Sequence, residues 1–130
     1  MSDVQIPEIP PDATPKWMFE ERLPKRLDAA LERFKDQLEG VEGVLQFNIE
    51  GDNGGQWCIT LKEGKGEVTA GENEDASTTF TISAEDWMAL IRREVDPQTI
   101  FMSGRMRIAG DMGLAMKLGQ IIRGAMAQEG

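Results

Sequence analysis

Residues 101–126 have the sequence FMSGRMRIAGDMGLAMKLGQIIRGAM, and this stretch decides the fold. From Met112 onward, apolar residues recur at helical spacing, with about 100° of rotation between successive residues. They cover an arc of roughly 220°, whereas a surface helix needs an apolar stripe of only about 100° to pack on a core. The segment therefore predicts a helix with two apolar edges, and only one of them can rest on the protein's own core.

The two edges differ in composition. The first consists of Leu114, Leu118, Ile121 and Ala125. The second, the methionine edge, consists of Met112, Ala115, Met116, Ile122 and Met126. From the pattern alone, three coverings of the second edge stay open: a bound lipid, tightly packed neighbouring helices, or a partner protein or second copy of the chain.

The N-terminal part predicts a tail and a helix. Pro7, Pro10 and Pro11 oppose regular structure, so we expect residues 1–14 to form a flexible tail before a single domain at 15–130. Thr14 followed by proline is typical of a helix start, and apolar residues at helical spacing continue to Gly40. Pro24 predicts a kink in this helix or the first turn of its main part.

The middle of the chain changes to an alternation of apolar and polar residues. Residues 45–49 and 57–61 alternate on either side of the glycine-rich turn 51–55, and shorter strands follow around Val68 and around Phe80. Each strand is apolar on one face only, which is typical of a largely antiparallel sheet with one wet face.

Helical signals follow the fourth strand. Ser83 and Asp96 each begin a short helix, Arg105 to Ile108 alternate as a fifth strand, and Asp111 caps the helix described first. The predicted fold class is therefore α+β, with about five strands and helices on one face of the sheet.

Composition excludes several functions. The formal net charge of −9 disfavours nucleic acid and anionic membrane surfaces as partners. Residues 1–83 hold 8 basic and 17 acidic side chains, which gives −9, whereas residues 84–130 hold 6 of each, which gives zero. The apolar C-terminal part is therefore electrically balanced.

Catalytic and metal-binding patterns are missing from the sequence. The chain has no histidine and no tyrosine, which removes the usual general base, histidine-based triads and most zinc sites. Its single cysteine, Cys58, has no histidine to activate it, so we expect a structural thiol in a reducing compartment. We therefore predict no enzyme activity, no catalytic residue, no metal and no cofactor.

Four segments resemble the sterol-carrier-protein, or non-specific lipid-transfer, domain family. They are GDMGLAMKL at 110–118, DPQTIFMSGRMRIAGD at 96–111, FTISAEDWMALI at 80–91 and VLQFNIEGDNGGQWCITLKEGKGEV at 44–68. They occur in order and with similar spacing, and the resemblance extends over about residues 17–126. It implies a five-stranded sheet, helices on one face, and between them an apolar tunnel for fatty acids, fatty acyl-CoA or sterol-like lipids.

The resemblance also implies which residues contact the lipid. The C-terminal helix would be the movable wall of the tunnel, and we expect the methionine edge to be the one that faces the ligand. The implied lipid-binding residues are Trp87, Leu90, Ile91, Ile100, Phe101, Met102, Met106, Ile108, Met112, Ala115, Met116, Gly119 and Ile122. A dry cavity of about 300 Å³ would cost roughly 7 kcal/mol, so we expect the tunnel to be partly collapsed or filled.

The predicted function is non-catalytic binding or carrying of an apolar small molecule in the cytoplasm, by a monomer or weak homodimer with at most transient membrane contact. Arg92, Arg93, Arg105, Arg107 and Arg123 are candidates to receive a carboxylate or phosphate at the tunnel mouth, although a solvated charge is favoured for each. The alternative is a protein-interaction or dimerisation module that docks through its C-terminal apolar helix.

Overall fold

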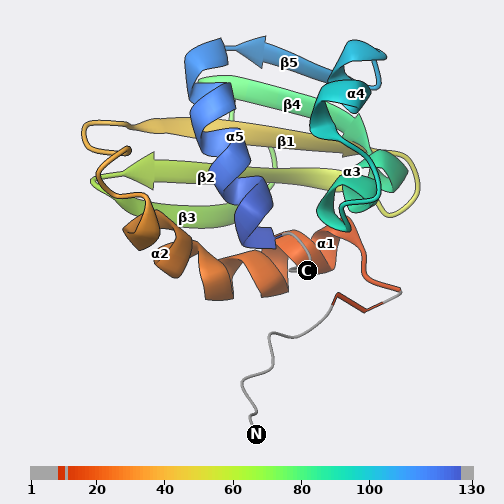
Figure 1. The fold of residues 1–130 in the computed structure, drawn as a ribbon, viewed down its shortest axis with the longest axis horizontal. Helices are drawn as coiled ribbons and strands as arrows, with labels where there is room; N and C mark the ends of the chain where they lie inside the picture. Colours follow the sequence, from red (N-terminus) through yellow and green to blue (C-terminus); the bar gives the residue numbers. More distant parts are fainter. Residues whose placement is uncertain (1–8, 11, 127–130) are drawn as a thin grey trace, which may run out of the picture.

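A five-stranded sheet carries helices on one of its faces in the computed structural model, which describes residues 9–10 and 12–126 (Figure 1). The strands are β1 (Gly43–Glu50), β2 (Gly55–Lys62), β3 (Lys65–Ala70), β4 (Thr78–Ser83) and β5 (Met106–Gly110). The helices are α1 (Pro15–Trp17), the π-helical turn η1 (Met18–Arg22), α2 (Leu23–Arg33), α3 (Ala84–Ile91), α4 (Pro97–Met102) and α5 (Met112–Met126). The predicted α+β fold class is confirmed.

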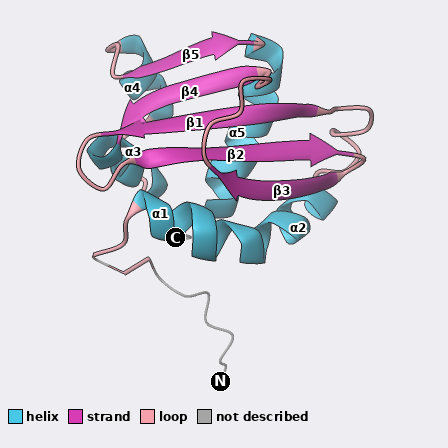
Figure 2. Cartoon of the chain, turned by 180° about the vertical axis from the view of Figure 1, so that it is seen from behind, coloured by secondary structure: helices cyan, strands magenta, loops and turns pink. Residues whose placement is uncertain are grey.

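The sheet has the order β3-β2-β1-β4-β5, and one of its four pairings is parallel. Strands β1 and β4 run parallel, with Phe47 opposite Phe80, while the other three pairings are antiparallel. The parallel pair arises because the chain leaves β3 at one edge and crosses the helix-free face to reach β4 (Figure 2). The sheet is therefore mixed, and with three antiparallel pairings it is largely antiparallel, as predicted.

The crossing segment, residues 71–77, covers part of the sheet face that was expected to be wet. The backbone N–H of Asn73 donates to Gln46 Oε1 at 2.7 Å, and the Cys58 thiol donates to the same oxygen at 3.0 Å. Gln46 and Cys58 are consequently both 2% exposed. Burial raises the pKa of the Cys58 thiol, which fits the predicted structural role.

Pro24 is accommodated by a change of helical pitch. Thr14 caps the first turn, accepting from the backbone N–H of Trp17 at 3.3 Å, and the wide turn η1 precedes Pro24. Such a turn accommodates a proline, which lacks the N–H that would complete the regular helix. Pro24 thus lies in the first turn of α2, which is one of the two alternatives predicted from the sequence.

The helix ends earlier than the apolar spacing predicted. Helix α2 stops at Arg33, and tight turns follow in which Leu38 N donates to Lys35 O and Gly40 takes a φ of +75°. Leu38 is still buried within these turns, so the spacing of buried apolar residues continues past the end of the helix. In the predicted tail, Ile9 is buried and Arg92 donates to the carbonyl of Pro10, while residues 1–8 and 11 lie outside the described part.

Five aromatic side chains form the centre of the core and are called the aromatic column here. They are Phe19, Phe47, Trp57, Phe80 and Trp87. Phe19 stacks on Trp57 with ring centroids 4.8 Å apart and on Trp87 with centroids 5.4 Å apart. The column therefore joins η1, the sheet and α3 through offset-stacked and tilted ring contacts.

Helix α5 is positioned by the turn that precedes it. Gly110 has a φ of +100°, and a Cβ there would overlap the carbonyl oxygen of Ser77. Asp111 then caps the helix as predicted, because its Oδ1 accepts from the backbone N–H of Leu114 at 3.0 Å. Ser83 caps α3 in the same way through the N–H of Asp86.

Replacing two glycines by alanine tests this turn. We expect Gly110→Ala to lower the free energy of unfolding by about 2 kcal/mol or more, because the new Cβ meets backbone at a positive φ. Gly124→Ala is the matched control: it lies in α5 with open space around its Cβ position, so we expect a gain of up to about 1 kcal/mol. Urea unfolding measures both, and equal effects would contradict this account.

Candidate functional site

Helix α5 packs on the rest of the protein through one edge. Its buried side chains are Leu114, Ala115, Leu118, Ile121, Ile122 and Ala125. At about 100° per residue they span roughly 120°, about half the arc that the sequence pattern allowed. The Leu114/Leu118/Ile121 edge thus packs on the core, together with Ala115 and Ile122, which the sequence analysis placed on the methionine edge.

The two methionines that begin the methionine edge lie in solvent. Met112 is 44% exposed and Met116 is 58% exposed. This edge faces the α3–α4 connection. Arg123, which lies between Met112 and Met116 around the helix axis, lines a cleft with residues 93–97. The two edges do have different surroundings, but contact between the methionines and a lipid stays a prediction.

The predicted lipid-binding residues fall into three groups by exposure. Six are buried: Trp87, Leu90, Ile91, Ile100, Ala115 and Ile122. Three are partly buried: Met106, Ile108 and Gly119. Four are exposed: Phe101, Met102, Met112 and Met116. The first two groups are part of the core or its margin, so the exposed group is the part that ordinary core packing does not explain.

One strand edge brings several of these residues together. Phe101 of α4 and Met106 and Ile108 of β5 line the same surface cleft, with a volume of about 470 Å³. Helices α4 and α5 both contact β5, and they lie on the same face of the sheet (Figure 1). The four exposed apolar side chains therefore belong to the two helices that contact β5, Phe101 and Met102 to α4 and Met112 and Met116 to α5.

The space between α5 and β4 is narrow where Gly119 lies. A Cβ on Gly119 would come within 3.3 Å of Phe80 Cζ, so the helix approaches the aromatic column closely there. In the same aromatic column, Trp87 is 4% exposed, and its indole N–H has no hydrogen-bond acceptor among the described residues. A buried donor without a partner costs about 1–3 kcal/mol, and a ligand oxygen or a water would relieve that cost.

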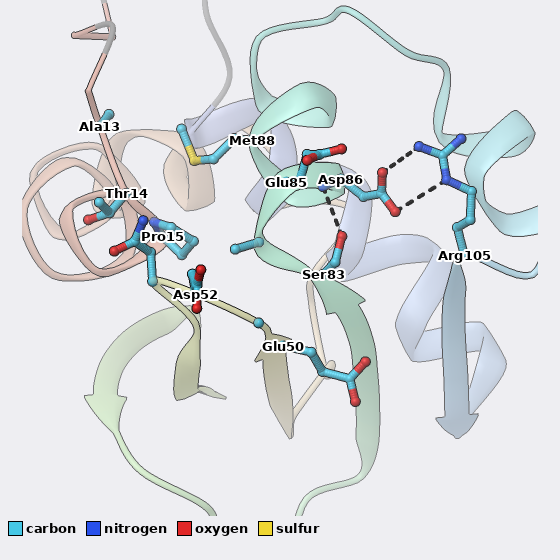
Figure 3. Close-up of a pocket in the computed structure, with 13 residues that line it drawn as sticks. Ala13, Thr14, Pro15, Glu50, Asp52, Ser83, Glu85, Asp86, Met88 and Arg105 are labelled. Atoms are coloured by element: carbon cyan, nitrogen blue, oxygen red, sulfur yellow. Dashed lines mark hydrogen bonds and ion pairs between the residues drawn. The ribbon is translucent and has the colours of Figure 1, made fainter.

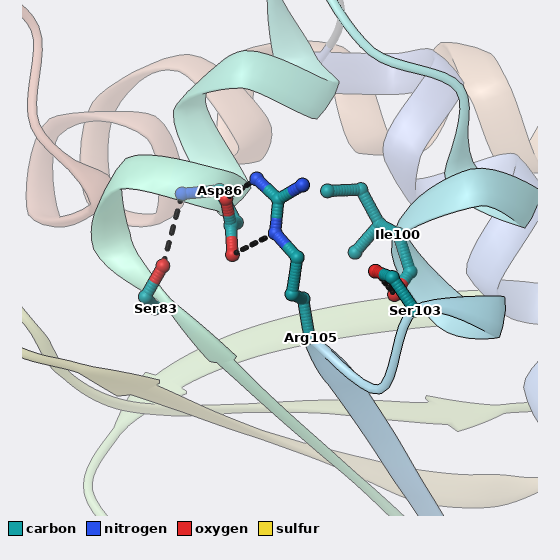
Figure 4. Close-up of polar contacts among 5 residues, drawn as sticks. All are labelled: Ser83, Asp86, Ile100, Ser103 and Arg105. Carbon is teal, nitrogen blue, oxygen red and sulfur yellow. Dashed lines mark hydrogen bonds and ion pairs between the residues drawn. The ribbon is translucent and has the colours of Figure 1, made fainter.

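A polar cleft of about 610 Å³ lies at the start of α3 (Figure 3). Glu50, Asp52 and Glu85 line it, and at one side Arg105 donates to both carboxylate oxygens of Asp86 (Figure 4). Arg105 is thus engaged in an ion pair and is not a free cation for a ligand carboxylate. In the described part of the chain, no cluster of three or more acidic or cysteine side chains could hold a metal.

A further cleft, of about 840 Å³, opens between α2 and α5. Its cationic lining consists of Lys25, Arg26 and Arg33 from α2 and of Arg93. Of these four, only Arg93 was a candidate from the sequence. The missed signal was the seven-residue spacing of Arg26 and Arg33, which places both side chains on one helix face.

Comparison with known proteins gives consistent results. Residues 25–123 match the model of the SCP-2 sterol transfer family. Human sterol carrier protein 2 is 30% identical over 118 residues, which are 88% of this chain and 22% of that protein. The chain spans about a fifth of the length of the curated relatives it matches first.

Two solved structures extend the likeness to the fold. The sterol carrier protein domain 2 of Helicoverpa armigera has a TM-score of 0.65 and 35% identity, with 91% of this chain and 96% of that chain covered. Palmitated SCP2L2 from Aedes aegypti has a TM-score of 0.61 and 27% identity, with 85% and 98% covered. Within the described residues, no helix is both long enough and apolar enough to cross a bilayer.

The Asp86–Arg105 pair predicts a pH dependence of stability. The hydrogen bond from Arg105 holds the pKa of Asp86 below its usual range. The pair therefore stabilises the fold above the ordinary aspartate pKa of about 3.9, and this contribution is lost as pH falls through the lower folded-state pKa.

We expect Asp86→Asn to lower the melting temperature by several degrees at neutral pH and by much less near pH 2. Asp28→Asn, on the exposed face of α2, is the control, and a pH-independent loss in Asp86→Asn would contradict the assignment.

Proposed function

Because the chain belongs to the SCP-2 sterol transfer family, we propose that it binds and carries an apolar ligand between α5 and the sheet, without catalysing a reaction. The observation that carries this proposal is the group of large apolar side chains left in water: Phe101, Met102, Met112 and Met116. Large apolar side chains left exposed on a small protein mark surface that another apolar molecule covers.

Helix α5 is the element that we propose moves. It packs through Leu, Ile and Ala side chains and reaches the aromatic column at Gly119, so it contributes no ring to that column. An apolar chain that enters beneath α5 would replace these contacts with similar ones. The methionines at its margin are flexible enough to fit ligands of different shapes.

The ligand class follows from the same surroundings. The expected ligands are fatty acids, fatty acyl-CoA and sterol-like lipids, and the palmitated state of the mosquito protein supports an acyl chain. The unpaired Trp87 N–H would bind one ligand oxygen in the interior. We propose that the protein works as a monomer in the cytoplasm and needs no cofactor.

The exposed group also supports a second function, docking of a partner protein or a second copy. Met102 is 75% exposed, more than a ligand lying beneath α5 would require. Native mass spectrometry of freshly purified protein separates the two functions. A monomer with the added mass of a lipid supports the carrier, whereas a ligand-free dimer that binds no fatty acid in titration would refute it.

Polar substitutions on the methionine edge test the location of the ligand. We expect the double variant Met112→Gln/Met116→Gln to bind a fluorescent fatty acid about tenfold more weakly, because two apolar contacts of roughly 0.7 kcal/mol each are lost. Both positions are exposed, so we expect the unfolding midpoint to be nearly unchanged.

Lys117→Gln is the matched control, since it places the same new side chain on α5 outside both apolar edges. We expect this variant to bind the probe like the wild type. Equal affinity of the double variant and the control would show that the methionine edge does not contact the ligand.

A further inference from the structure

The cleft between α2 and α5 combines charged walls with an apolar floor. Helices α2 and α5 contact each other, with the C-terminal half of α5 beside α2 (Figure 1). The floor includes Ile121 and Ala125, which are each 6% exposed and belong to the buried edge of α5. Ala30 and Phe34 of the α2 side also pack against the core. The floor of this cleft is therefore continuous with the apolar interior beneath α5.

Its charged lining is entirely cationic. Lys25, Arg26, Arg33 and Arg93 line the cleft, and no carboxylate is among the described residues that line it. The whole chain has a formal net charge of −9, so a local group of four cations is opposite to the overall balance. Lys25 and Arg33, whose side chains are exposed at the cleft, favour an anion there over a neutral or cationic group.

The two arginines of α2 share one face. At about 100° per residue, Arg26 and Arg33 lie within roughly 20° of each other, whereas Asp28 and Glu32 lie about 100° or more from both. Lys25 lies within roughly 20° of Glu32 and still lines the cleft. The arginine face of α2 is therefore turned toward α5, and Lys25 reaches the cleft from the margin of that face.

A neighbouring cleft, by contrast, carries charges of both signs. Arg123, on the far edge of α5, lines it together with Arg93, Glu94 and Asp96. Burial and the positive charge of Arg93 lower the pKa of Arg123, while Asp96 opposes that shift. Two guanidinium groups thus lie near each other where α5 meets the α3–α4 connection.

We propose that the cleft between α2 and α5 holds the anionic headgroup, a carboxylate or a phosphate, of an amphiphile whose apolar chain lies beneath α5. This inference rests on the proposed carrier function and adds the polar end of its ligand. Arginine and lysine bind carboxylate and phosphate oxygens through charge-assisted hydrogen bonds.

The two ends of such a ligand have places on opposite sides of α5. The cationic cleft lies on the α2 side, where Ile121 and Ala125 line it. Met112 and Met116 lie roughly 140–180° around the helix from those two residues. A helix with its side chains is about 10–12 Å wide, which a long acyl chain exceeds. With the headgroup at α2 and the acyl chain beneath α5, the free end of the acyl chain therefore lies near the methionine edge.

Paired ligands that differ only in the headgroup test this inference. Dodecanoic acid and dodecanol are titrated into wild type, into Lys25→Gln/Arg33→Gln and into Lys62→Gln/Lys65→Gln by isothermal calorimetry. The first variant removes two exposed cations of the cleft, and the control removes two exposed cations of the β2–β3 hairpin. Unfolding midpoints of all three proteins verify that each is folded.

We expect wild type and control to bind the acid about tenfold more tightly than the alcohol. In Lys25→Gln/Arg33→Gln the affinity for the acid falls about three- to tenfold and that for the alcohol is unchanged. If the acid binds equally to all three proteins, the headgroup site is overturned while the carrier function stands. If neither ligand binds, the proposed function fails, and the headgroup site fails with it.

Inorganic phosphate distinguishes a lipid headgroup from a free anion. We expect millimolar phosphate alone to give no measurable heat, because the apolar chain supplies most of the affinity of the amphiphile. Phosphate binding that is lost in Lys25→Gln/Arg33→Gln, together with unchanged binding of dodecanoic acid, would make the cleft a free-anion site and overturn the inference.

Discussion

The stacking of Phe19 between Trp57 and Trp87 is the interaction on which the rest of the structure depends. These rings come from η1, β2 and α3, and Phe47 and Phe80 extend the aromatic column across β1 and β4. Each ring buries a large apolar area and fixes the angle of its neighbour, so the column sets where the N-terminal helices and α3 lie on the sheet. The distorted turn before Pro24 keeps Phe19 buried within this column.

Helix α5 is attached differently from these elements. Its buried side chains are aliphatic, and it contacts the column through a glycine beside Phe80. A turn at Gly110, which has a positive φ, and an aspartate cap fix its start. A cover of this kind can shift without breaking the aromatic column, because adjacent aliphatic surfaces can be exchanged for an apolar ligand. The exposed methionines at one edge and the cationic cleft at the other are where such a ligand would emerge from beneath the helix.

The amino-acid sequence predicted the elements more completely than their arrangement. Alternation identified the strands and capping residues identified α3 and α5, since both signals depend on neighbouring residues. The parallel pairing of β1 with β4 depends on residues 71–77 crossing the sheet, a long-range contact that local patterns do not encode. The rotation of α5 about its axis was predictable only in part. The apolar period correctly placed Leu118 in the core, but the burial of Ala115 and Ile122 and the exposure of Met116 depend on how the helix packs. The cationic cleft could not be foreseen because it requires that the Arg26/Arg33 face of α2 lie opposite α5.

The central claim is that an apolar ligand lodges between α5 and the sheet. Amide hydrogen exchange with and without saturating palmitate tests it most directly, since it reports local opening residue by residue. Without ligand, the amides of α5 should exchange faster than those of β1 and β2, and palmitate should slow α5 strongly while changing the strands little. Exchange in α5 that matches the central strands and does not change when palmitate is bound would contradict the account.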